Sequence, residues 1–185
     1  ELSWSHLFFF SSCRSDLFED FIDISKFDSY QTVTSLGSNT GEWTIRNFCH
    51  SDHQTEFGDT VYITANISVS RRISGNNFHE IYNIWDGHFL EDNRTVPPDP
   101  VIETALEVRD KYPNKRLIVH ILQPHCPFIT RAENGYTREV FEPPNEQKTS
   151  YIWHDLAQGN VSQKSLVEAY GETLRIGWET AEPLL

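Results

Sequence analysis

The chain has 185 residues, of which 38% are hydrophobic and 13% aromatic, enough for the core of one domain with little room for a second. Its 27 acidic and 15 basic residues give a net charge of −12, which repels the phosphates of nucleic acids. No apolar run approaches the roughly 18 residues of a membrane-spanning helix, and the apolar run at residues 7–10 lacks the basic leader of a secretion signal. We therefore expect one domain over residues 1–185, with no membrane span and no nucleic-acid partner.

The first half of the chain alternates between strand and helix patterns. Residues 7–10 form a continuous apolar run, which is typical of a short strand buried on both faces. From Asp16, a candidate N-cap, to Ile24 the apolar residues have helical spacing. Further along we expect a strand at residues 30–36, a helix at about 42–48, a strand at 60–65 and a weaker strand at 81–85.

The clearest unit is a helix followed by an apolar strand. Residues 101–112 have the pattern of an amphipathic helix, and residues 116–122 form a buried strand. A helix that leads into such a strand is half of a parallel crossover. We expect this strand to be central and flanked by the first strand, with the helix on one face and with Ile118 and Ile121 almost fully buried.

The rest of the chain predicts a loop and two helices. Residues 130–149 are polar and read as an extended surface loop, residues 151–158 as a short helix, and Ser162 as the N-cap of a last helix. In an α/β protein such a helix normally returns the chain to another parallel strand, yet the sequence stops at Leu185. We therefore expect the front part of a larger fold.

The cysteines and the basic residues indicate the environment. Cys13, Cys49 and Cys126 are odd in number and form no Cys-x-x-Cys pair, which favours reduced thiols in a cytoplasm over disulfides or a zinc site. Ten of the 15 basic residues are arginine, and carboxylates outnumber the basic residues. This balance is similar to that of proteins adapted to high salt, although an ordinary acidic protein fits it equally well.

Three polar loops follow three predicted strands, at residues 11–16, 35–43 and 123–128. In an open α/β sheet the ligand site lies beyond the carboxyl ends of the strands. A hydroxyl at a helix start lies near N–H groups that can hold an anion, and a metal could activate it as a nucleophile. The simpler alternatives remain: hydroxyls there are usually caps, and His125 fits a turn histidine bonded to the backbone. His120, inside an apolar strand, is expected to be a hydrogen-bonded core histidine.

Two long strings carry a resemblance to a known family. SLGSNTGEW at residues 35–43 and LIVHILQPHCPF at residues 117–128, after the opening FFFSSCRSDLFED, resemble the sulfatase-like proteins of haloarchaea, members of the alkaline phosphatase superfamily. The resemblance is spread over most of the chain. It implies an α/β sandwich with a central, mostly parallel sheet, here incomplete at its C-terminal end.

The resemblance also implies a chemistry and its residues. Such proteins hydrolyse or transfer sulfate or phosphate esters of small molecules or glycans at a divalent metal, here Ca, Mg, Mn or Zn without distinction. Thr40 stands at the nucleophile position, with Ser38 as the alternative or a substrate contact. His125 stands where the family contacts the substrate anion or the leaving oxygen. Arg14 could add positive charge, although an ion pair with Asp16 is the simpler role.

Two departures from the family pattern concern the metal. Ser11 stands at the position of the family's first acidic metal ligand, and a neutral hydroxyl replaces a carboxylate poorly on a dication. The downstream Asp-His-Gly segment, which brings the other ligands, is absent. Three hypotheses follow: a sulfatase-like hydrolase that is a fragment or degenerate copy, a non-catalytic anion- or glycan-binding protein that keeps the fold, and a truncated product without independent function. An incomplete fold should expose an apolar sheet edge and favour oligomers.

Overall fold

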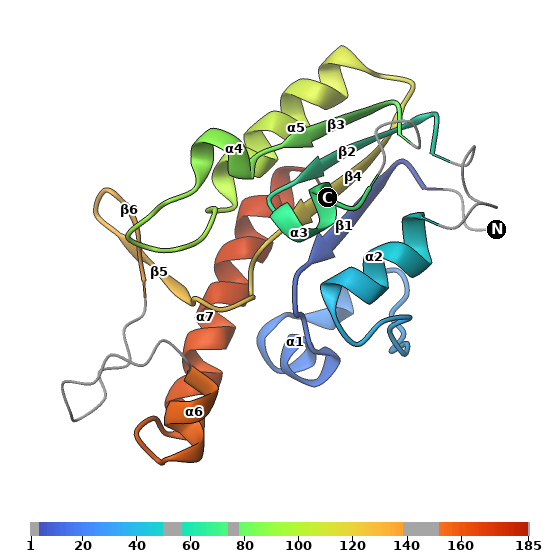
Figure 1. Cartoon of the computed structure of the whole chain (residues 1–185). Coiled ribbons are helices and arrows are strands. Elements are labelled where there is room, and N and C mark those ends of the chain that lie inside the picture. Colours follow the sequence, from blue (N-terminus) through green and yellow to red (C-terminus); the bar gives the residue numbers. More distant parts are fainter. Residues whose placement is uncertain (1–3, 50–56, 74–77, 139–151, 185) are drawn as a thin grey trace.

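The computed structural model describes residues 4–49, 57–73, 78–138 and 152–184, and shows an α/β fold (Figure 1). Four parallel strands form the central sheet in the order β1-β4-β2-β3. Their bounds are β1 His6–Phe10, β2 Thr60–Thr64, β3 Glu80–Asn83 and β4 Arg116–Ile121. Because parallel neighbours need crossovers, helices cover both faces of this sheet.

Strand β4 lies inside the sheet, between β1 and β2, as predicted. Phe9 pairs with His120 on one side of β4, and Tyr62 pairs with Ile118 on the other. Ile118 is 0% exposed and Ile121 is 1% exposed. A strand with neighbours on both sides and helices on both faces is shielded from solvent, which explains its mostly apolar sequence.

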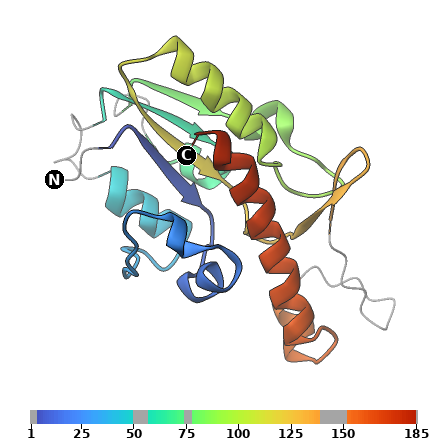
Figure 2. The ribbon, with the colours of Figure 1, turned by 180° about the vertical axis from the view of Figure 1, so that it is seen from behind.

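The helices divide between the two faces, as Figures 1 and 2 show from opposite sides. Their bounds are α1 Ser15–Phe21, α2 Thr40–Phe48, α3 Ile67–Ser70, α4 Trp85–His88, α5 Asp99–Lys111, α6 Ile152–Ala157 and α7 Gln163–Ala181. Helix α5 packs on one face together with the C-terminal end of α7, and α2 and α3 pack on the other. Alternation along the strands separates the two cores: Val61 and Ile63 face α5, whereas Tyr62 faces α2 and α3.

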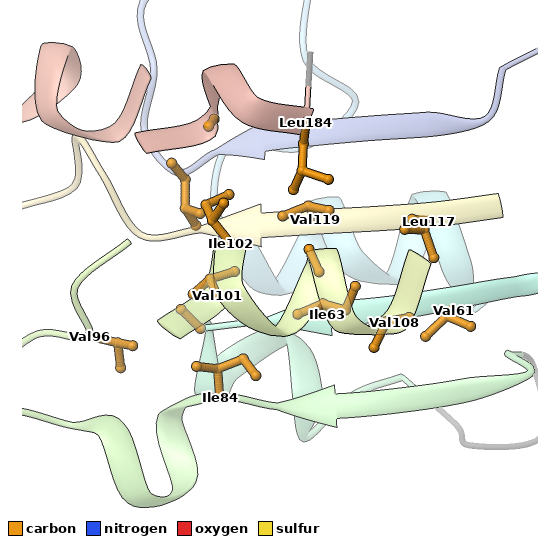
Figure 3. Close-up of a cluster of buried hydrophobic side chains, with 14 residues drawn as sticks. Val61, Ile63, Ile84, Val96, Val101, Ile102, Val108, Leu117, Val119 and Leu184 are labelled. Atoms are coloured by element: carbon orange, nitrogen blue, oxygen red, sulfur yellow. The ribbon is translucent and has the colours of Figure 1, made fainter. Parts of the chain in front are cut away.

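The core under α5 fixes the position of this helix on the sheet (Figure 3). Val101, Ile102 and Val108 of α5 are at most 3% exposed and pack against Val61 and Val119. Helix α5 begins at Asp99 with Pro98 at its N-cap, and Pro100 lies in its first turn, where a proline lacks only an N–H that the helix start would leave unpaired. The expected helix at residues 101–112 is thus confirmed, with its start two residues earlier.

Three local predictions are wrong. Residues 30–36 form no strand: Val33 is 71% exposed and Leu36 is 56% exposed, so these apolar side chains are not packed against the sheet. Asp16 is not an N-cap, because α1 begins at Ser15 and Arg14 occupies the cap position. Residues 130–138 are not a loop but part of a hairpin.

The hairpin consists of β5 Ile129–Ala132 and β6 Gly135–Arg138, paired antiparallel. Gly135 has a φ of 121° at the turn, a conformation that favours glycine, and Ile129 is fully buried. The turn at Glu133 and Asn134, followed by Gly135, and the buried strand start therefore outweighed the polar composition. Residues 139–149 of the expected loop lie outside the described residues. Among the described helices, none combines the length and apolar character that crossing a bilayer requires.

Candidate functional site

A cleft of about 810 Å³ opens at the carboxyl ends of β1 and β4. Three loops reach it: the one that follows β1, the one that precedes α2 and the one that follows β4, with α6 and α7 forming a further wall. All five residues singled out from the sequence line this cleft, namely Ser11, Arg14, Ser38, Thr40 and His125. Parallel strands end at the same edge of the sheet, which brings segments that are distant in sequence together.

The cleft has a polar part and an apolar part. Its lining includes hydroxyls, amides, one arginine and two imidazoles, together with a group of apolar side chains formed by Phe128, Trp153, Leu156, Leu166 and Val167. None of the described residues that line it is aspartate or glutamate, although the chain carries a net charge of −12. The described lining is therefore without carboxylates, although Asp16 and Glu42 contact the lining residues Arg14 and Ser38 from outside it.

The floor of the cleft is connected to the core through His120. The Ser11 Oγ lies 2.9 Å from His120 Nε2, and the Tyr62 Oη lies 2.9 Å from His120 Nδ1. His120 is 4% exposed and Tyr62 is fully buried. Burial lowers the pKa of His120 to about 3 and raises that of Tyr62, so both are neutral. The expected core histidine is confirmed, and in addition it reaches the cleft.

Asn66 lies beside Ser11 on the same floor. Its Oδ1 accepts hydrogen bonds from the N–H groups of Ser68, at 3.0 Å, and Val69, at 3.3 Å. These two bonds orient the amide, so that its NH₂ group faces the Ser11 Oγ at 3.5 Å. Sequence reasoning missed Asn66 and Tyr62. The signal available for Tyr62 was alternation, which places it on the same face of the sheet as His120.

The loop before α2 is held by caps. Asn39 is the N-cap and accepts from the Glu42 N–H at 3.0 Å. The Glu42 carboxylate accepts from the Ser38 N–H at 2.9 Å and from the Ser38 hydroxyl at 3.0 Å. Gly37 approaches the backbone of Trp43 so closely that a Cβ would lie 2.3 Å from the Trp43 nitrogen. The Ser38 hydroxyl is thus already hydrogen-bonded to Glu42 at the start of α2.

Thr40 is the first residue of α2, and no base among the described residues is bonded to its hydroxyl. Among the described residues, no hydrogen bond to its hydroxyl is found; its carbonyl accepts from Thr44 at 2.6 Å. Glu42, the base candidate of this loop, is held by Ser38 and by Arg46, with an Arg46–Glu42 distance of 2.7 Å. Hydrogen bonds from Ser38 and the charge of Arg46 lower the pKa of Glu42, which makes it a weaker base.

Arg14 and His125 lie at the rim. The Arg14 guanidinium pairs with Asp16 at 2.6 Å and both side chains are exposed, as the simpler interpretation proposed. The Arg14 N–H donates to the Tyr170 hydroxyl at 2.8 Å, which attaches this loop to α7. The Nδ1 of His125 is hydrogen-bonded to the Cys126 carbonyl oxygen, so Nδ1 carries a proton.

The residues of the cleft do not fit a dication site. Hard cations prefer carboxylate oxygens, and the described lining offers none. Within the described part of the chain, no group of three or more His, Cys, Asp and Glu is arranged to hold a metal ion. Cys13, Cys49 and Cys126 are free thiols.

No family model, no curated protein and no solved structure matches the chain.

Proposed function

We propose that this chain binds a sulfate or phosphate ester of a small molecule or glycan in the cleft between β1, β4 and α2, and does not hydrolyse it. The observation that carries this proposal is the absence of carboxylates from the described lining of a cleft in a chain of net charge −12. Carboxylates in the lining would repel an anion, whereas hydroxyl and amide donors stabilise it. The two that contact lining residues, Asp16 and Glu42, are each paired with an arginine.

The two parts of the cleft fit the two parts of an ester. Ser11, Thr40 and Asn66 supply hydroxyl and amide groups at the polar end, with the Arg14 charge at the rim. The apolar end, which includes the 64% exposed Trp153, offers a surface for an aromatic or sugar ring. The polar end would hold the oxyanion, and the apolar end would hold the organic group.

Hydrolysis by a sulfatase-like mechanism is the second candidate, because Thr40 and His125 line the same cleft. A threonine hydroxyl is a weak nucleophile unless a neighbouring base or a metal activates it. Thr40 has no hydrogen-bonded base among the described residues, and Glu42 is held by Ser38. The geometry therefore favours binding over turnover.

Calorimetric titration with 4-nitrophenyl sulfate and 4-nitrophenyl phosphate tests the proposal. We expect saturable binding that weakens with salt, and a loss of up to about fivefold in Arg14→Gln because an exposed charge is worth about 1 kcal/mol or less. Arg109→Gln is the matched control, since Arg109 also pairs with an exposed aspartate, at 3.1 Å, and does not line the cleft.

The same esters separate the two candidates. With Mg²⁺, Mn²⁺, Ca²⁺ or Zn²⁺ present, we expect no more release of nitrophenol than from Thr40→Val. Metal-dependent release that disappears in Thr40→Val would replace the binding proposal by the hydrolase. Absence of binding for both esters would reject the proposal.

A further inference from the structure

A hydrogen-bonded chain runs from the core to the floor of the cleft through Tyr62, His120 and Ser11. Its direction follows from the proton of the Tyr62 hydroxyl. Tyr62 is 0% exposed, and its only hydrogen-bond partner among the described residues is His120 Nδ1. A buried O–H that donates to nothing is costly, so Tyr62 donates and His120 Nδ1 accepts.

The direction at Tyr62 sets the direction at Ser11. A neutral imidazole carries one proton, and with Nδ1 as acceptor this proton lies on Nε2. The His120 Nε2–H therefore donates to the Ser11 Oγ, 2.9 Å away. The oriented NH₂ group of Asn66 faces the same oxygen at 3.5 Å. Two donors thus face the Ser11 oxygen.

The hydroxyl proton of Ser11 also needs an acceptor. No acceptor for it is found in the described part of the chain, and Ser11 lines the cleft. His120 cannot accept this proton, since its facing nitrogen already carries one. Ser11 is thus neither activated as a nucleophile by His120 nor free to offer its lone pairs to a cation.

We propose that the chain from Tyr62 through His120 holds the Ser11 hydroxyl as a hydrogen-bond donor to an oxyanion oxygen of the ligand in the cleft. Ser11 contacts the ligand, and Tyr62 and His120 are positioning residues. This inference rests on the proposed function and deepens it, because it gives Ser11 a role in anion recognition. In the family that the sequence resembles, an acidic metal ligand stands at this position. The Asn66 NH₂ group supplies a second donor on the same floor.

The first test reads the direction of the chain without a ligand. Nitrogen NMR of the ¹⁵N-histidine-labelled protein distinguishes the two neutral tautomers. We expect His120 protonated on Nε2 and unprotonated on Nδ1 in the wild type. In Tyr62→Phe, which deletes only the hydroxyl, we expect this preference to be lost. A wild-type His120 that carries its proton on Nδ1 would overturn the inference.

The second test measures affinity for inorganic sulfate and inorganic phosphate. We expect Ser11→Ala to weaken binding by about tenfold to a hundredfold, the range for a hydrogen bond to a charged group. Tyr62→Phe should weaken it less, by about threefold, because the Ser11 hydroxyl remains but is no longer held in one orientation. Ser70→Ala is the control: Ser70 accepts one side-chain N–H, from Trp85 at 3.1 Å, and does not line the cleft.

The outcomes separate the inference from the proposed function. If the wild type binds and Ser11→Ala binds as tightly as Ser70→Ala, the inference is wrong and the binding proposal stands. If Mn²⁺ broadens the His120 ring signals in the wild type but not in Ser11→Ala, Ser11 is a metal ligand and the inference is again wrong. If the wild type binds neither ion nor either nitrophenyl ester, the proposed function itself fails.

Discussion

The imidazole of His120 is surrounded by groups that carry no charge. Its ring lies 5.6 Å from the Phe9 ring and 5.7 Å from the Trp43 ring, measured between centroids, and its nitrogens contact Tyr62 and Ser11. Burial without a neighbouring carboxylate disfavours the imidazolium and lowers the pKa of His120 to about 3. The folded state therefore favours the neutral form of this histidine.

The pH dependence of stability follows from this burial. The unfolded His120 has a pKa of about 6.5, so below it the unfolded chain binds a proton that the folded chain does not. The contribution of His120 is complete above that pH and is lost as the pH falls toward 3. As the pH is lowered below about 6.5, we expect the free energy of unfolding of the wild type to fall more steeply than that of His120→Gln. The difference between the two slopes approaches about 1.4 kcal/mol per pH unit. Urea unfolding of both proteins at several pH values down to about 5, where most carboxylates are still ionised, measures this difference. Equal dependence of the unfolding free energy on pH in the two proteins would contradict the prediction.

At the scale of elements, the contact between α1 and α7 depends on a glycine. A Cβ on Gly171 of α7 would lie 2.2 Å from the Phe21 ring of α1. The Phe21 ring also contacts Arg175 of α7, whose guanidinium lies over the ring, 4.9 Å from its centroid. Tyr170, next to Gly171, hydrogen-bonds the loop after β1. This contact thus positions one wall of the cleft.

Replacing Gly171 by alanine sets two effects against each other. Helix propensity favours alanine by about 1 kcal/mol, whereas the collision with Phe21 costs about 1–3 kcal/mol. We expect Gly171→Ala to destabilise the wild type and to stabilise the Phe21→Ala background, where the ring is missing. Urea unfolding of the four proteins gives the coupling. A Gly171→Ala change that is stabilising in both backgrounds would show that α1 moves away at no cost.

At the scale of the whole molecule, strand β1 forms one edge of the sheet that the described strands make. Among the described strands, β1 pairs only with β4. Leu117 donates to the Ser5 carbonyl and Ser11 donates to the Ile121 carbonyl, so the alternating backbone groups of His6 and Phe8 face away from β4. An apolar edge strand with free N–H and C=O groups can pair with another copy.

We expect this edge to cause self-association that increases with salt. Salt screens the repulsion between copies that each carry a net charge of −12. His6→Pro should reduce association, since it removes an outward N–H at a position where proline is tolerated, whereas His6→Ala keeps that N–H. Light scattering after size exclusion, at low and high salt, compares the three proteins. A wild type that stays monomeric at both salt concentrations would reject edge pairing.

The sequence by itself determined those elements whose pattern is local, such as a continuous apolar run or a helix cap. Strand β4 is buried on every side, so its continuous apolar run predicts both its position in the sheet and the burial of Ile118 and Ile121. Ser162 caps α7 as expected, because a cap is decided within one turn of helix. For residues 30–36 the sequence prediction failed, since a short segment with few apolar residues becomes a strand only where a neighbouring strand pairs with it.

Only the tertiary structure decided what lies at the floor of the cleft. Tyr62 and His120 are 58 residues apart in sequence, and Ser11 and His120 are 109 apart. Their contacts depend on the strand order β1-β4-β2 and on a register that no local pattern contains. The sequence could place Ser11 and His125 in loops after strands and Thr40 near a helix start. It could not give the direction of a hydrogen bond, which depends on which donors and acceptors meet. These pairs are set by tertiary packing, because a buried hydroxyl needs a hydrogen-bond partner and the fold decides which side chains lie within reach.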